Sequence, residues 1–231
     1  MTISTFPDLV QGSDEWLAAR RGVLTASEMK LIVTPGKKPA WNDKARAHLY
    51  ELLAQRLTGH VEPHFISDDM LRGQEEEVYA RMHYEQAVAP VTEVGFITND
   101  RWGFTLGYSP DGLVGEDGLI EAKSRRQKFQ VQTIIEHVAA QTIPDEFVLQ
   151  CQTGLLVTER KWLDFLSISN GMSMPIIRVF PDPEVQEAII EAAALFEAKI
   201  AHHRALYDAA LASGHRLVAT MRREPAGEII L

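Results

Sequence analysis

Two acidic residues and a lysine lie close together around a predicted β-hairpin. Asp111 stands in the turn-forming segment Ser-Pro-Asp-Gly, and Glu121 and Lys123 follow on the far side of an Asp-Gly pair. Side chains alternate between the two faces of a strand, so Glu121 and Lys123 point the same way. If the two arms pair, Asp111 reaches the same end of the sheet. The spacing therefore predicts that two carboxylates and an ammonium group converge at one spot.

This combination suits the hydrolysis of a phosphodiester. Carboxylate oxygens are the ligands that Mg²⁺ prefers, and a bound Mg²⁺ polarises a phosphoryl oxygen and acidifies an attacking water. The charge of Lys123 would balance the negative charge that develops on phosphorus, and the lysine would act as a base only with a strongly lowered pKa. An exposed hairpin with a cross-strand ion pair would carry the same residues. The pattern alone leaves both interpretations open.

Composition is that of an ordinary globular protein. The 231 residues are 45% apolar and 24% charged, and without a repeat or a clear linker we expect residues 1–231 to form one α/β domain. Cys151 is the only cysteine, which excludes an internal disulfide and a four-cysteine zinc or iron–sulfur site within the chain. It stands in an apolar helical pattern, so we expect it to pack in the core.

No segment has the pattern of a transmembrane span, and residues 1–10 lack the basic start and apolar run of a signal peptide. These features predict a cytoplasmic protein. The net charge of −9 neither supports nor excludes DNA as a partner, because phosphate binding depends on local positive charge.

Local signals predict the elements that must hold the hairpin in place. Capping residues predict helices that begin after Ser13, Thr25, Asn42 and Ser67. Apolar periodicity predicts further helices at 131–140, 147–157 and 184–211. Segments rich in β-formers predict strands at 91–98, 104–108, 161–169 and 176–180.

Some polar residues on these elements have two possible roles. The capping box that begins at Thr25 offers free N–H groups to an anion, and Ser27 and Arg20 would complete a phosphate clamp, although such caps are common in helices. One acid of the triplet 75–77 can turn toward the hairpin, and the spacing does not say which. One of two glutamines at 150 and 152 can hydrogen-bond toward the same place.

The order of these motifs resembles the lambda exonuclease family, the YqaJ-type viral recombinases of the PD-(D/E)xK nuclease superfamily. The resemblance covers about residues 13–158, and the joint order of the motifs is far more specific than any one of them. The matching segments are Trp16, Arg20–Ser27, Gly73–Glu77, Ser109–Leu113, Gly118–Lys123 and Gln150–Gln152.

The resemblance implies a fold and a set of roles. The fold would be a restriction-endonuclease-like α/β core, with a central mixed β-sheet flanked by helices. The implied catalytic residues are Asp111, Glu121, Lys123 and Gln150; the implied ligands of two Mg²⁺ ions, with Mn²⁺ as a substitute, are Asp111, Glu121, Glu77 and the carbonyl of Ala122. The implied 5′-phosphate site is Arg20, Ser27 and Ser109.

The resemblance also implies an activity and partners. Relatives degrade one strand of duplex DNA from a 5′-phosphorylated end, 5′ to 3′, releasing mononucleotides and leaving a 3′ overhang. They are ring-shaped homotrimers of phage or prophage origin in bacterial hosts, and they work with a single-strand annealing protein. Lys37 stands near the position of a DNA-contacting arginine, and Met70 falls where a relative has an apolar wedge. We expect Arg125, in the most basic stretch of the chain, to track the DNA backbone.

Three other functions are alternatives to this prediction. A DNA endonuclease of the same superfamily would share the site, and a non-catalytic DNA-binding adaptor would share the fold. A CRISPR adaptation nuclease is disfavoured because its relatives usually carry an iron–sulfur cluster, for which one cysteine is insufficient. Residues after about 170 match weakly, so the trimer is implied by the family alone.

Overall fold

A computed structural model describes residues 2–62 and 67–222 of the chain, apart from the side chain of Asp69. Over these residues the strands form two four-stranded mixed sheets. The first sheet has the order β1-β3-β4-β2, with β1 at Ile3–Phe6, β2 at Leu24–Thr25, β3 at Phe96–Asn99 and β4 at Leu106–Tyr108. The second has the order β5-β6-β7-β8, with β5 at Gly112–Val114, β6 at Gly118–Ser124, β7 at Trp162–Ile168 and β8 at Ile176–Val179.

The predicted hairpin is formed by β5 and β6, which pair antiparallel from Gly112 opposite Ile120 to Val114 opposite Gly118. Strand β6 is longer than β5 and also pairs in parallel with β7, where Glu121 lies opposite Phe165. The end of β6 therefore extends past its short partner. Its backbone groups on that side are left to contact the segment before β5.

Helices begin and end largely where their caps predict. The helices are α1 (Asp14–Arg20), the 3₁₀ turn η1 (Ala26–Glu28), α2 (Met29–Ile32), α3 (Asp43–Thr58), α4 (Asp68–Ala87), α5 (Gln127–His137), α6 (Asp145–Thr158) and α7 (Pro183–Leu211). The side chains of Ser13, Asn42 and Ser67 accept hydrogen bonds from the first turns of α1, α3 and α4. Helix α3 ends at Gly59, which has a φ of 67° that glycine adopts without strain.

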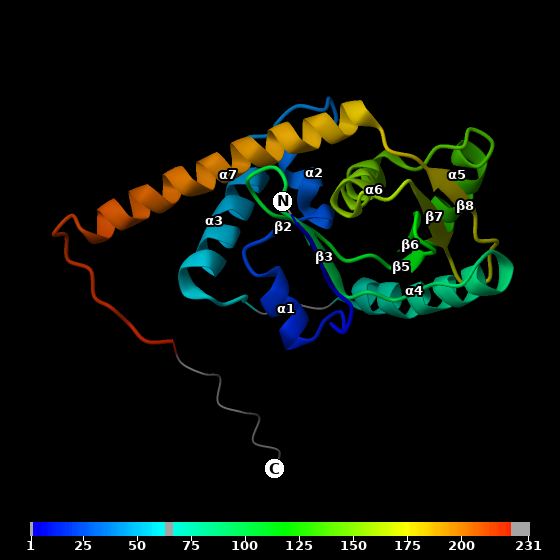
Figure 1. The fold of residues 1–231 in the computed structure, drawn as a ribbon, viewed down its shortest axis with the longest axis horizontal. Coiled ribbons are helices and arrows are strands. Elements are labelled where there is room, and N and C mark those ends of the chain that lie inside the picture. The colour runs from blue at the N-terminus through cyan, green and yellow to red at the C-terminus, as the bar shows by residue number, and fades with distance from the viewer. Residues whose placement is uncertain (1, 63–66, 223–231) are drawn as a thin grey trace, which may run out of the picture.

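Helix α6 lies between the two sheets and contacts β3, β4 and β7. Helix α7 runs along one long side of the molecule against α3 and α6, and α4 lies along the opposite side against β6 and β7 (Figure 1). The larger apolar cluster joins residues of both sheets, including Leu106, Leu119 and Leu163. A smaller cluster packs Ala80 and Tyr84 of α4 on β6 and β7.

The expected α/β fold with mixed sheet and flanking helices is confirmed, with one difference. The strands are divided between two sheets, whereas we expected one central sheet. The division falls between β4 and β5, where Pro110 interrupts the chain: proline has no N–H to donate to a ladder, and the turn changes the strand direction. Among the described residues, no helix is long and apolar enough to cross a lipid bilayer.

Candidate active site

The hairpin brings Asp111, Glu121 and Lys123 together as predicted. The Lys123 Nζ donates to Glu121 Oε1 at 2.5 Å, so the two side chains share one face of β6. Asp111 stands just before β5, and its Oδ2 accepts the backbone N–H of Ala122 at 2.6 Å. Both carboxylates are buried, with 1% of Glu121 and 7% of Asp111 exposed. Burial of two acids side by side is costly unless a cation or hydrogen bonds compensate the charge.

Glu121 receives three donors from three different elements. Besides Lys123, they are the Tyr108 hydroxyl of β4 at 2.6 Å from Oε2 and the Gln150 Nε2 of α6 at 2.5 Å from Oε1. Of the two candidate glutamines, Gln150 therefore faces the site. Helix α6 comes close to Tyr108 because residue 154 is glycine: a Cβ there would lie 2.8 Å from the tyrosine ring. The glutamine and the tyrosine together fix the Glu121 carboxylate in orientation.

The acidic triplet of α4 divides by helical position. Glu75 is exposed, and Glu76 is buried and accepts the backbone N–H of Asn170 at 3.2 Å. Glu77 faces the site and lines the same cavity as Asp111. Burial raises the pKa of Glu77, and the Glu121 charge adds to that rise. The structure thus answers which acid turns toward the hairpin.

Burial also raises the pKa of Asp111 well above its ordinary value, and the charges of Glu121 and Glu77 raise it further. Three carboxyl groups therefore line one cavity, where Lys123 is bonded to Glu121. Mg²⁺ is usually held by one or two carboxylates together with several waters. Asp111 and Glu121, with Glu77 beside them, fit that demand.

The backbone of Ala122 offers one further oxygen. In a strand, the N–H and C=O of one residue face the same neighbour, so the Ala122 carbonyl faces the side from which Asp111 approaches. Among the described residues, no group of three or more His, Cys, Asp or Glu side chains is arranged to hold a metal ion by itself.

Lys123 is held as a cation in this protein. Desolvation lowers its pKa, but the Glu121 and Asp111 charges together raise it by more, and the net shift is upward. Of the two roles considered for this lysine, the geometry favours charge compensation and positioning. A neutral base would require the opposite shift.

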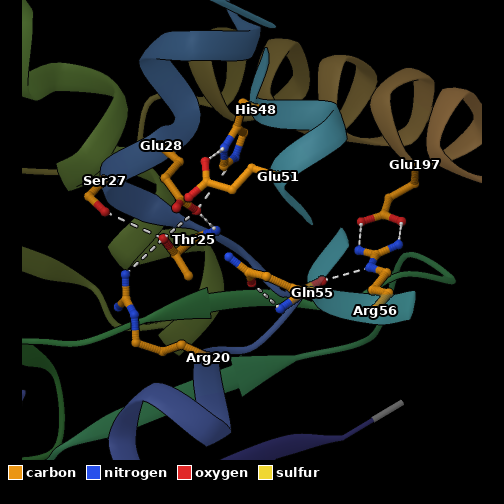
Figure 2. A network of polar contacts seen from close by, with 10 residues as sticks. Arg20, Thr25, Ser27, Glu28, His48, Glu51, Gln55, Arg56 and Glu197 are labelled. Carbon is orange, nitrogen blue, oxygen red and sulfur yellow. Dashed lines mark hydrogen bonds and ion pairs between the residues drawn. The ribbon is translucent and has the colours of Figure 1, made fainter. Parts of the chain in front are cut away.

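Arg20 lies near these acids without an ion pair to any described carboxylate. Its guanidinium stacks on Trp16, with Cζ 4.2 Å from the ring centroid, and donates to Ser109 Oγ at 3.2 Å and Thr25 Oγ1 at 3.1 Å. Burial lowers the pKa of Arg20, which shows how little water solvates the group, while Glu28 nearby raises it. Figure 2 shows Arg20 pointing toward Thr25, with Ser27 beside the same hydroxyl. A partly buried cation bonded mainly to neutral hydroxyls is suited to receive an anion.

One cavity of about 190 Å³ collects all eight side chains predicted for catalysis, metal binding and 5′-phosphate binding. They come from α1, η1, α4, β6, α6 and the segment between β4 and β5. Its lining comprises Gln11, Trp16, Arg20, Ala26, Ser27, Glu77, Tyr108, Ser109, Asp111, Glu121, Lys123 and Gln150.

The three predicted DNA-contacting residues lie outside this cavity lining. Lys37 is partly exposed and pairs with Glu184 at 3.0 Å, and Met70 is exposed on the first turn of α4. Arg125 has only 9% of its side chain exposed, because it pairs with Glu146 and lies against two phenylalanine rings. These protein contacts do not test the DNA contact expected of Arg125, which stays a prediction.

Several residues in or near the cavity were not singled out from the sequence. Trp16 is one of the matching segments and Tyr108 directly precedes another, but a hydroxyl or an indole N–H in an apolar pattern indicates core packing until its partner is known. Arg81 of α4 donates to the carbonyl of Asp111 at 3.2 Å. Only its spacing of one helical turn from Glu77 could have indicated that it reaches the same place.

The family model of the YqaJ-like viral recombinase domain matches residues 15–161. The alkaline exonuclease LHK-Exo of Laribacter hongkongensis is 31% identical over 85% of this chain and 98% of its own, with a TM-score of 0.69; its complex with dAMP gives a TM-score of 0.70 with the same identity and coverage. A phage-related exonuclease of Haemophilus somnus 129PT has a TM-score of 0.53 at 11% identity, over 79% of this chain and 96% of its own, and shows likeness of fold alone. No curated protein sequence matches the chain.

Proposed function

The chain belongs to the YqaJ-like viral recombinase family, and from that premise we propose that it is a Mg²⁺-dependent exonuclease that degrades duplex DNA from 5′-phosphorylated ends. The family and the alkaline exonuclease relative support the broader statement of a nuclease in phage-type recombination. The observation that carries the proposal is the cavity, which combines the buried carboxyl groups of Asp111 and Glu121 with a partly buried cation, Arg20, that makes no ion pair with a described carboxylate. A DNA end offers the matching pair of groups, a scissile phosphodiester and a terminal phosphate.

The carboxylate side of the cavity would hold the metal and the scissile phosphate. Asp111, Glu121, Glu77 and the Ala122 carbonyl would hold one or two Mg²⁺ ions, with Mn²⁺ as a substitute. When bound, such ions polarise the phosphoryl oxygen and lower the pKa of a water. Lys123 stays protonated and stabilises negative charge on phosphorus, while Gln150 holds Glu121 in orientation.

The other side of the cavity would hold the terminal 5′-phosphate. Arg20 has five N–H donors, of which the described hydroxyls of Ser109 and Thr25 use two. The remaining N–H donors of Arg20 and the hydroxyls of Ser27 and Ser109 suit a phosphate. The phosphate would give Arg20 the negatively charged partner that no described carboxylate provides. Anchoring the end would set the distance to the bond that is cut, which favours mononucleotide release; the dAMP complex of the relative supports the same product.

The remaining features of the proposal rest on the family. We propose that the protein acts as a homotrimer, with a single-strand annealing protein that covers the 3′ overhang, in the cytoplasm of a bacterial host of a phage or prophage. Lys37 and Met70 lie on exposed surface and are the proposed contacts to the duplex. The mass of the protein in solution tests the trimer directly, with about three protomers expected.

The decisive experiment uses linear duplex DNA labelled at a 5′-phosphate, with and without Mg²⁺. Release of labelled mononucleotide that requires Mg²⁺ and is lost in Asp111→Asn supports the proposal. Nicking of covalently closed circular DNA would instead indicate an endonuclease. Binding of DNA ends without any Mg²⁺-dependent cleavage would indicate a non-catalytic adaptor.

A further inference from the structure

A chain of polar contacts runs from the phosphate side of the cavity into the core beneath it (Figure 2). Arg20 donates to Thr25 Oγ1, and Thr25 donates to Glu28 Oε2 through its hydroxyl at 2.7 Å and its backbone N–H at 3.0 Å. Glu28 in turn faces the imidazole of His48, whose Nε2 lies 3.7 Å from Oε2. Neither Glu28 nor His48 lines the cavity, so any effect they have on a ligand passes through Thr25 and Arg20.

The Thr25 hydroxyl has one proton, and the contacts fix where it points. A carboxylate only accepts, so the 2.7 Å contact requires Thr25 to donate to Glu28. The hydroxyl oxygen is then left as an acceptor, which is what the Arg20 guanidinium requires. Ser27 Oγ lies 3.4 Å from the same oxygen, so its own proton can turn either toward Thr25 or into the cavity. Glu28 thereby fixes the direction in which the Thr25 hydroxyl donates, beside the phosphate site.

The imidazole of His48 lies on the side of the Glu28 carboxylate that faces away from the cavity. His48 is buried, with 2% of its side chain exposed, and stacks on Phe196 of α7 with ring centroids 5.7 Å apart. Its other nitrogen, Nδ1, lies 3.2 Å from Glu51 of the same helix. The imidazole therefore packs α3 and α7 against the back of Glu28, although its Nε2 makes no hydrogen bond among the described residues.

Charge acts in the same direction as geometry. Arg20 is partly buried and has no ion pair with a described carboxylate, and the Glu28 charge nearby raises its pKa. Glu28 reaches Arg20 only across the Thr25 hydroxyl, so it supports the cation without occupying its free donors. A carboxylate bonded directly to Arg20 would compete with the incoming phosphate.

We propose that Glu28 is a positioning residue that makes the cavity selective for phosphorylated DNA ends, by holding Thr25 as the acceptor that aims Arg20 at the terminal phosphate. The inference rests on the proposed function, because it assigns a residue to the 5′-phosphate site of that reaction. It adds Glu28 and Thr25 to the residues that determine the preference between a 5′-phosphate and a 5′-hydroxyl.

The test compares kcat/KM on the same duplex with 5′-phosphate and with 5′-hydroxyl ends. In Glu28→Ala we expect the ratio of the two values to fall about 10-fold, the effect of losing one hydrogen bond to a charged group. In Glu28→Gln an amide oxygen still accepts from Thr25, so we expect most of the ratio to return. Glu15→Ala removes an exposed acid from α1, the helix that carries Arg20, and should leave the ratio unchanged.

A double-mutant cycle separates positioning from general destabilisation. Thr25→Val keeps the shape of the side chain and loses the hydroxyl, so it should lower the ratio as Glu28→Ala does. In combination with Arg20→Ala, Thr25→Val should cause no further loss, because Thr25 acts through Arg20. Additive losses, or an equal loss on both kinds of end, would overturn the role of Glu28. If Glu28→Ala fails to fold, the Thr25 cycle decides alone.

The same data distinguish this inference from the proposed function. A wild-type protein with no preference for phosphorylated ends would refute the 5′-phosphate site itself. A wild-type preference that Arg20→Ala abolishes and that Glu28→Ala and Thr25→Val leave intact would refute only the positioning role.

Discussion

The two sides of the cavity carry opposite charge and are built in different ways. The carboxylate side takes Asp111, Glu121 and Lys123 from one hairpin and its entry, and there burial and the Glu121 charge raise the pKa values of Asp111 and Glu77. The phosphate side combines Arg20 of α1 with Ser27 of η1 and Ser109 before β5, and it holds a cation among neutral hydroxyls. The carboxylate side has three carboxyl groups beside Lys123, and Arg20 on the phosphate side lacks an anionic partner among the described residues. This difference is what the proposed function requires, because a DNA end and its metal would bring a negative group to one side and a positive ion to the other.

The strongest way to break this comparison is Asp111→Asn, which removes a charge from the carboxylate side while keeping its shape. We expect cleavage to fall on the order of 10³-fold, as for loss of a group that stabilises developing charge. Cleavage rates on 5′-phosphorylated duplex under saturating Mg²⁺ provide the measurement. Asp117→Asn is the matched control, because Asp117 lies in the turn of the same hairpin and makes only an exposed ion pair with Lys161. Undiminished cleavage in Asp111→Asn would show that this carboxylate takes no part in the reaction.

Addition of Mg²⁺ should stabilise the folded protein through the carboxylate side alone. At about 100 times its Kd, a ligand of the native state contributes about 2.7 kcal/mol, which corresponds to a rise in Tm of roughly 5–10 °C for a chain of this size. Thermal melting with and without EDTA measures the rise. The shift should persist in Arg20→Ala and shrink in Asp111→Asn; an equal shift in both variants would mean that the ion binds elsewhere.

On the phosphate side, Arg20→Ala should lower the preference for 5′-phosphorylated over 5′-hydroxyl ends by about 10–100-fold, because a charge-assisted hydrogen bond contributes about 1.5–3 kcal/mol. Competition between the two kinds of end for one enzyme sample gives the ratio. Arg21→Ala serves as control, since the Arg21 side chain donates to the carbonyl of Gly59 on the surface. If Arg20→Ala and Arg21→Ala show the same preference for phosphorylated ends, Arg20 does not bind the 5′-phosphate.

The smallest expected effect is a dependence of stability on pH in metal-free protein. The pKa values of Asp111 and Glu77 are raised on folding, so the native state binds more protons than the unfolded state above the ordinary pKa of these groups. The stability that Asp111 and Glu77 contribute is therefore fully present below the ordinary carboxyl pKa, and it is lost as the pH rises through their raised pKa values. Urea unfolding across the acid range should show this loss, and Asp111→Asn should reduce it. A profile unchanged in that variant would contradict the crowding of carboxyl groups.

Helix and strand positions were largely predictable because their signals are local. The caps at Ser13, Asn42 and Ser67 bond to the first turns of the helices that follow them, and the turn at Asp117–Gly118 joins the predicted hairpin. The division into two sheets was not predictable. It depends on which strands pair across long stretches of chain, and a strand pattern specifies its faces but not its neighbours.

The sequence by itself determined that Glu121 and Lys123 share a face, because strand alternation is fixed by backbone geometry. It also gave, through the order of its motifs, the family to which the chain belongs. Spacing left open which acid of the triplet faces Asp111, the family resemblance implied Glu77, and the tertiary structure places Glu77 and Asp111 in one cavity. Only the tertiary structure decided that Arg125 pairs with Glu146 and that Glu28 lies behind Arg20. These outcomes depend on how α4, α6 and η1 pack against the sheets. Packing selects one side chain from several equivalent ones by burial and by partners distant in the chain, and no local pattern carries that information.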